Sequence, residues 1–151
     1  MGCASALAPG GGPAIRRREK IMRRGARAIT LRAATAAEQV AATALAMGGL
    51  DVSPRAYRPA ATGALGAAII VRGASTPWTV AAVEEERGDG LAEARAEGRA
   101  RALARLFCAE FRTPPHTVSA DAVTVEFTGA STAAVSRRAG VWFDDEAEGA
   151  A

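Results

Sequence analysis

The sequence is poor in the residues that usually build metal centres and disulfide frameworks. It holds two cysteines, Cys3 and Cys108, and one histidine, His116. The cysteines lie far apart, and no cysteine or histidine has the short spacing typical of metal ligands. The glycine motifs of phosphate loops and dinucleotide sites are also absent. The sequence therefore predicts no metal site, no cofactor and no disulfide.

Long apolar runs are absent as well. The longest uncharged apolar run covers residues 64–71, far below the roughly 20 residues that a helix needs to span a bilayer. The N-terminus also lacks the apolar core of a secretory signal. The 151 residues suffice for one domain with its own core. We therefore expect a cytoplasmic protein with a single folded domain.

Lysine is nearly absent: Lys20 stands beside eighteen arginines. GC-rich coding DNA produces such a bias, so the arginine count alone predicts no function. The distribution of charge is more informative, because residues 1–32 carry eight basic side chains and one acidic one, whereas residues 33–139 carry eleven of each. The expected organisation is a basic flexible extension at 1–26, a folded domain at 27–143 and an acidic tail at 144–151.

The basic extension allows three interpretations. Little in it can be buried, so a solvated tail is the simplest. Its composition, rich in arginine and alanine and poor in acids, is also typical of organelle-targeting segments. Its start, Met1-Gly2-Cys3, fits membrane acylation, although the motif prefers serine or threonine where this chain has Ala6.

The first half of the domain predicts a strand, a helix and a strand. Residues 28–32 place two apolar side chains on one face, as in a short strand. Thr35 and Glu38 form a capping box before an apolar helical stripe, and Gly48-Gly49 ends that helix. A connection then leads to an apolar strand at 67–71.

The second half repeats this order after a tight turn. Residues 78–86 alternate as in a strand, and residues 91–111 have the apolar stripe of a long helix. Residues 123–127 then alternate cleanly between apolar and polar side chains. We expect residues 129–140 to form a loop or short helix, followed by a small edge strand at 141–143.

The sequence of each half thus predicts a βαβ unit. Such crossovers are right-handed in nearly all cases, which would place both helices on the same face of the sheet. The other face would stay open, and the apolar second strand with Trp78 favours packing against another copy of the chain. The sequence predicts an α+β fold with one four-stranded mixed sheet and two helices on one face. A monomeric ferredoxin-like fold is the alternative.

Several local motifs accompany this order of elements. They are Pro54 with Tyr57, Gly73-Ala74-Ser75-Thr76-Pro77 in the central turn, Leu103 to Phe107, Ser119 to Phe127, and Gly140-Val141-Trp142-Phe143. Together they resemble the tautomerase superfamily that includes macrophage migration inhibitory factor and D-dopachrome tautomerase, over about residues 27–143. The resemblance implies a tautomerase-like domain, a homotrimer, and keto–enol isomerisation of a small keto-acid or aromatic ligand.

The departures from that family concern its chemistry. Family members begin with a proline whose amine is the general base, but here that position falls near Arg27, where a peptide nitrogen cannot act as a base. The family's lysine after the first helix is missing, and Glu85-Glu86-Arg87 replaces Ser-Ile-Gly. The resemblance therefore implies weak or lost activity. The remaining candidates are Glu85 and Glu86 as catalytic residues and Arg72, Ser75 and Trp142 as substrate-binding residues.

Other chemically active side chains have simpler interpretations. His116 follows two prolines and fits a solvated loop. Cys108 lies in an apolar helix segment and fits a buried, inert thiol. Arginines of the long helix alternate with glutamates, which is typical of a solvated face.

Two functional hypotheses follow. The first is a homotrimeric relative of keto–enol tautomerases with weak or lost activity. The alternative is a ferredoxin-like binding module whose basic extension engages nucleic acid or an anionic membrane.

Overall fold

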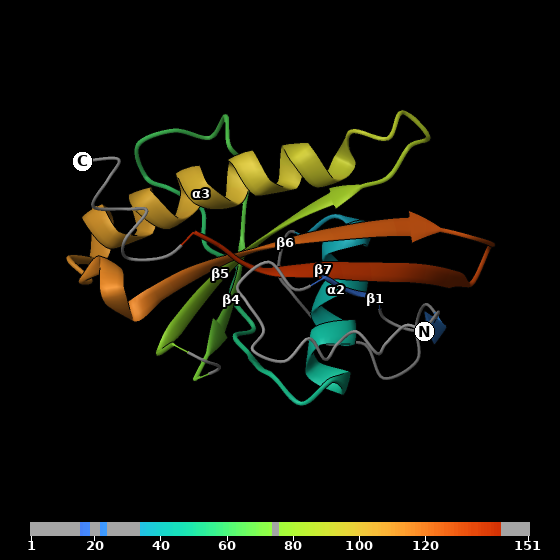
Figure 1. The fold of residues 1–151 in the computed structure, drawn as a ribbon, viewed down its shortest axis with the longest axis horizontal. Helices are drawn as coiled ribbons and strands as arrows, with labels where there is room; N and C mark the ends of the chain where they lie inside the picture. Colours follow the sequence, from blue (N-terminus) through green and yellow to red (C-terminus); the bar gives the residue numbers. More distant parts are fainter. Residues whose placement is uncertain (1–15, 19–21, 24–33, 74–75, 143–151) are drawn as a thin grey trace.

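The computed structural model describes residues 34–73 and 76–142, together with the backbone of residues 16–18 and 22–23. One mixed sheet and two long helices make up this part of the chain (Figure 1). The strands are β1 (Arg16–Arg18), β2 (Met22–Arg23), β3 (Asp51–Val52), β4 (Ile69–Arg72), β5 (Trp78–Glu85), β6 (Val118–Phe127) and β7 (Thr132–Trp142). The helices are α2 (Ala36–Met47), α3 (Ala92–Phe111) and the short 3-10 helix η1 (Pro115–Thr117).

The strands follow the order β1-β7-β6-β5-β4-β3, and β2 also pairs with β7. The predicted α+β class, with a mixed sheet and two helices, is confirmed, but the predicted four-stranded sheet is wrong, because the described part of the chain forms a seven-stranded sheet. The predicted first strand at 28–32 lies outside the described residues. Among the described residues, no helix is both long and apolar enough to cross a membrane.

Helix α2 begins at the predicted capping box. The Thr35 hydroxyl accepts the Glu38 N–H at 3.1 Å, and the Glu38 carboxylate accepts the Thr35 N–H at 3.0 Å. These bonds satisfy N–H groups that the start of a helix otherwise leaves unpaired. Gly49 follows the helix with φ of 95°, a left-handed conformation that glycine adopts without steric cost.

The two strands predicted at the centre of the chain are confirmed by β4 and β5. These strands pair antiparallel, with Arg72 opposite Trp78. Strand β5 then leads through α3 to β6, which lies parallel beside it. A parallel neighbour needs such a crossover, and the crossing helix covers one face of the sheet. The predicted helix at 91–111 is confirmed, and the predicted strand at 123–127 begins earlier, at Val118.

The two helices lie on opposite faces of the sheet, so the prediction that they share one face is wrong. Helix α2 packs over one set of strand residues, which includes Ile69, Val71, Ala81, Val83, Val123 and Val125. Helix α3 packs over the alternate set, which includes Ile70, Val80, Ala82, Ala120 and Ala122. Because β3 runs antiparallel to β4, α2 belongs to no crossover among the described strands, and the handedness rule does not constrain its face. Both faces of the central strands are apolar, and each is covered by one helix.

Residues 132–142 form the long strand β7, where a loop or short helix and a small edge strand were expected. Strand β7 pairs antiparallel with β6, and Ala133 and Val135 reach the core under α2. Alanine, serine and arginine dominate this segment, and their strand propensity is low. Pairing with β6 overrides that propensity, so the expectation of a loop or helix is wrong.

Two short segments of the basic extension pair with the outer edge of β7. Residues 16–18 lie opposite residues 138–136, and residues 22–23 lie opposite residues 133–132. These strands cover part of an edge that would otherwise present unpaired N–H and C=O groups. Part of the basic extension therefore belongs to the sheet.

Candidate functional site

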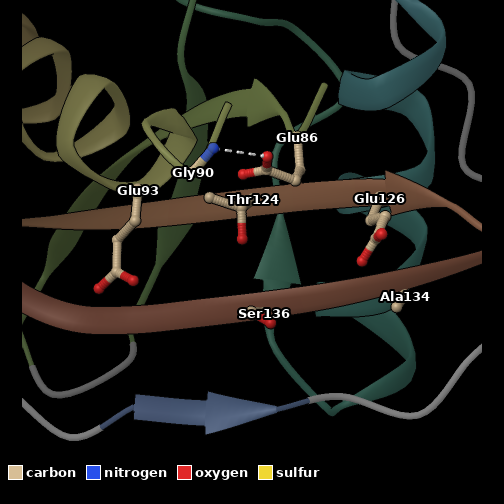
Figure 2. Close-up of a pocket in the computed structure, with 7 residues that line it drawn as sticks. All are labelled: Glu86, Gly90, Glu93, Thr124, Glu126, Ala134 and Ser136. Atoms are coloured by element: carbon tan, nitrogen blue, oxygen red, sulfur yellow. Dashed lines mark hydrogen bonds between the residues drawn. The ribbon is translucent and has the colours of Figure 1, made fainter. Parts of the chain in front are cut away.

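A polar groove opens on the α3 face of the sheet, where α3 begins (Figure 2). Strands β6 and β7 extend past the start of α3, so the helix does not cover this end of the face (Figure 1). The groove has a volume of about 200 Å³ and is lined by Glu86, Gly90, Glu93, Thr124, Glu126, Ala134 and Ser136. We call it the acidic groove, because its three charged lining residues are glutamates.

Two of these glutamates have structural partners. The Glu86 carboxylate accepts the N–H groups of Gly88 at 2.8 Å and Gly90 at 3.1 Å, which holds the loop before α3 (Figure 2). Glu93 lies 3.3 Å from a guanidinium nitrogen of Arg138, which also contacts Glu97 at 2.5 Å. The groove is therefore built partly from groups that hold α3 and its preceding loop against β7.

The chemistry available in the acidic groove is that of hydrogen-bond acceptance and negative charge. Neither His116 nor Cys108 lines it. Across the described residues, no group of three or more histidine, cysteine, aspartate or glutamate side chains could hold a metal ion. Carboxylates favour cationic groups and repel anions, so a keto acid would be disfavoured here.

A second polar cluster lies on the opposite face of the sheet and is buried. The Ser119 hydroxyl lies 3.0 Å from that of Thr79 and 3.2 Å from that of Thr76. Two residues further along β6, Asp121 accepts the Gly140 N–H at 3.0 Å and lies 3.3 Å from Nε of Arg137. The pairing of β6 with β7 shifts register between Ala120 and Ala122, and these contacts connect β5 and β6 with that irregular part of β7. The cluster therefore holds the three strands together within the fold.

Burial raises the pKa of Asp121 above its ordinary value, while Arg137 and the Gly140 N–H act in the opposite direction. Between the ordinary value of 3.8 and the raised value, the folded state binds more protons than the unfolded chain. The contribution of Asp121 to the free energy of unfolding is therefore largest at low pH and declines as pH rises through this window.

We accordingly expect the free energy of unfolding of the wild type, minus that of Asp121→Asn, to decrease as pH rises from about 4. Urea titrations of both proteins at several pH values measure this difference. An increase with pH would contradict the prediction and would show that Arg137 outweighs the effect of burial.

The structure does not bring the predicted site residues together. Arg72 lies opposite Trp78, at the start of β5, whereas Glu85 ends that strand. Seven residues of strand separate these positions by about 23 Å. Arg72 contacts Asp51, and Glu85 contacts Arg87, both in exposed ion pairs. One small substrate therefore cannot contact both ends of β5.

The remaining predicted positions are buried or lie outside the described residues. Trp142 is 1% exposed and packs in the core under α3, so it offers no surface to a ligand in this structure. Glu86 belongs to the acidic groove. Arg27 and Ser75 lie outside the described residues.

The simpler interpretations of His116 and Cys108 agree with their surroundings. His116 is exposed in η1. Cys108 is half-buried against the core under α3, and burial raises the pKa of its thiol. A raised thiol pKa leaves less of the reactive thiolate at neutral pH.

The groups that build the two polar clusters were not apparent from the sequence. Thr124 and Glu126 share the polar face of the strand predicted at 123–127, which is half of the signal for the acidic groove. The other half required β7, which was expected to be a loop. Asp121 and Arg137 were missed for the same reason, because only the pairing of β6 with β7 brings them together.

Comparisons with protein-family models, with curated proteins and with solved structures gave no significant match. The tautomerase resemblance therefore stays a prediction made from the sequence.

Proposed function

We propose that this protein binds nucleic acid through its basic N-terminal extension, with the α+β domain acting as the folded anchor of that extension. The observation that carries the proposal is the separation of charge along the chain. Residues 34–142 contain eleven arginines and eleven acidic residues, whereas residues 1–32 contain eight basic residues and one acidic residue. The excess positive charge therefore lies in the N-terminal extension.

Ion pairs within the domain further reduce the attraction of its arginines for a polyanion. Among the described residues, at least seven arginines of the domain lie within ion-pair distance of a carboxylate: Arg72, Arg87, Arg95, Arg99, Arg101, Arg137 and Arg138. A guanidinium beside a carboxylate contributes little net attraction for a phosphate. The extension therefore supplies most of the attraction that a polyanion would experience.

Nucleic acid fits the extension better than an anionic membrane does. Guanidinium groups match phosphate oxygens through paired hydrogen bonds. Membrane anchoring needs apolar area besides charge, and between Arg16 and Arg27 only Ile21 and Met22 carry large apolar side chains. The same span has no aromatic side chain for stacking on bases. We therefore expect contacts with the phosphate backbone and little sequence preference.

The proposal predicts strongly salt-dependent binding. If about four cations of the extension neutralise phosphates, affinity for a DNA duplex should fall roughly 100-fold between 50 and 200 mM salt. Replacing Arg16, Arg17 and Arg18 together with glutamine should weaken binding about 30-fold at about 0.1 M salt, because three phosphate contacts are lost. Fluorescence anisotropy with a labelled duplex measures both effects.

A matched control removes three exposed arginines of the domain by the combined substitutions Arg55→Gln, Arg105→Gln and Arg112→Gln. It changes the net charge equally and should alter affinity about two-fold or less. Equal losses in the two triple variants would place the binding surface on the domain. Tighter binding to phosphatidylserine vesicles than to DNA would instead favour a membrane as the partner.

The tautomerase relationship and the homotrimer stay predictions of the sequence. The placement of α2 and α3 on opposite faces removes the open sheet face that motivated the trimer, so both predictions now depend on the resemblance alone. Light scattering of the full chain measures the oligomer, and a phenylpyruvate assay measures the isomerase activity. Acylation and organelle targeting concern residues that lie outside the described part of the chain.

A further inference from the structure

Strand β1 lies where the proposed nucleic-acid contact and the folded domain meet. Its three arginines belong to the segment that we propose to bind phosphate, and they also form a ladder with β7. The same residues therefore take part in two interactions, one within the chain and one with a partner.

The surroundings of the β7 edge are unfavourable for a polyanion. Figure 2 shows the acidic groove on β6 and β7, with the blue strand β1 running along the outer side of β7. Glu93 and Glu126 line that groove beside Ser136, the residue that pairs with Arg18. Carboxylates within a Debye length, about 8–10 Å at physiological salt, repel an approaching phosphate.

The arginines of β7 do not cancel this repulsion. Arg138 contacts Glu93 and Glu97, and Arg137 contacts Asp121. Their positive charge is thus already balanced by carboxylates of α3 and β6. A nucleic acid reaching the paired β1 would meet the groove glutamates as well, whereas a released β1 would carry its charge away from them.

The ladder that holds β1 is short enough to open. β1 pairs over three residues and β2 over two, against an eleven-residue β7. Ladders of three and two residues form only a few backbone hydrogen bonds with β7, so little free energy holds these segments in place.

We propose that the outer edge of β7 is an internal docking surface for the basic strand, and that docking on β7 and binding of nucleic acid exclude one another. This inference rests on the proposed function and concerns how nucleic-acid binding is regulated. The domain holds part of the basic extension on β7 until the phosphate groups of a nucleic acid compete for it. The apparent affinity for nucleic acid is then reduced by the fraction of molecules in which β1 is released.

The test compares two full-length double variants with the same charge. Arg17→Pro with Arg18→Pro removes two backbone N–H groups, and Arg17→Gln with Arg18→Gln keeps both. Neighbouring residues of an antiparallel strand direct their N–H groups to opposite sides, so one of the two prolines falls where the N–H would face β7. The proline variant should bind the duplex about three-fold or more tightly than the glutamine variant, because its basic strand is no longer docked.

Equal affinities of the two double variants would overturn the competition and leave the proposed function standing. Failure of the wild type to bind DNA at low salt would overturn the proposed function and this inference together.

Hydrogen exchange of the wild-type chain supplies an independent readout. Adding DNA should accelerate amide exchange in residues 132–138, because β7 loses its partner strand. Without DNA, the proline variant should already exchange faster in this segment than the glutamine variant. Unchanged or slower exchange of the wild type on DNA binding would overturn the inference, since it would show that β1 stays docked.

Discussion

Replacing Trp142 with alanine is expected to lower the free energy of unfolding by about 4 kcal/mol, the range seen when a buried tryptophan is truncated. Trp142 is 1% exposed and is the largest of the fully buried side chains. It packs with Leu103 and Ala104 in the core between α3 and the sheet. Truncation would leave a cavity that rigid strands and a 20-residue helix cannot close.

Trp142→Phe is the matched control for this prediction. The indole Nε1 is buried without a hydrogen-bond partner in the described part of the chain, so phenylalanine loses volume but no hydrogen bond. We expect it to be far less destabilising than alanine in urea titrations. A small effect of Trp142→Ala would contradict the core position and would support the alternative that Trp142 contacts substrate.

Replacing Arg99 with methionine is expected to cost about 3 kcal/mol and to lower the Tm by about 10 °C. Arg99 extends from α3 and donates to Glu84 at 2.8 Å and to the carbonyl oxygens of Leu65 at 2.9 Å and Ala67 at 3.2 Å. It also donates to the carbonyl oxygen of Val83. Methionine retains the apolar stem but leaves these half-buried carbonyl oxygens without their donor.

Arg95→Met, one turn earlier in α3, tests whether the position of the guanidinium matters. Arg95 pairs with the carboxylates of Asp89 and Glu84, and its side chain is 40% exposed, against 17% for Arg99. Water screens ion pairs of a partly exposed side chain, so Arg95→Met should lower the free energy of unfolding much less than Arg99→Met does. Thermal unfolding of both variants measures the contrast. Equal shifts would show that the carbonyl contacts of Arg99 contribute little.

Local patterns in the sequence were sufficient where neighbouring residues decide the structure. The capping box of Thr35 and Glu38 depends on groups three residues apart, so its sequence pattern implies its geometry. The long helix α3 follows from a periodic stripe within one segment. The hairpin of β4 and β5 follows from two apolar runs joined by a short turn.

The sequence led to wrong predictions where the structure depends on contacts between residues far apart in the chain. The segment of β7 has little strand propensity of its own and becomes a strand by pairing with β6. The apolar residues on both faces of the central strands were visible in the sequence. They were assigned to a partner molecule, although α2 and α3 each cover one face.

The sequence by itself determined the α+β class, the limits of α3, the start of α2 and the concentration of positive charge near the N-terminus. Each of these depends on composition or on contacts between near neighbours. Only the tertiary structure decided that the helices take opposite faces, that β7 completes the acidic groove and that β1 pairs with β7. These features depend on strand register and on the burial of both sheet faces, and both arise from contacts between residues far apart in the chain.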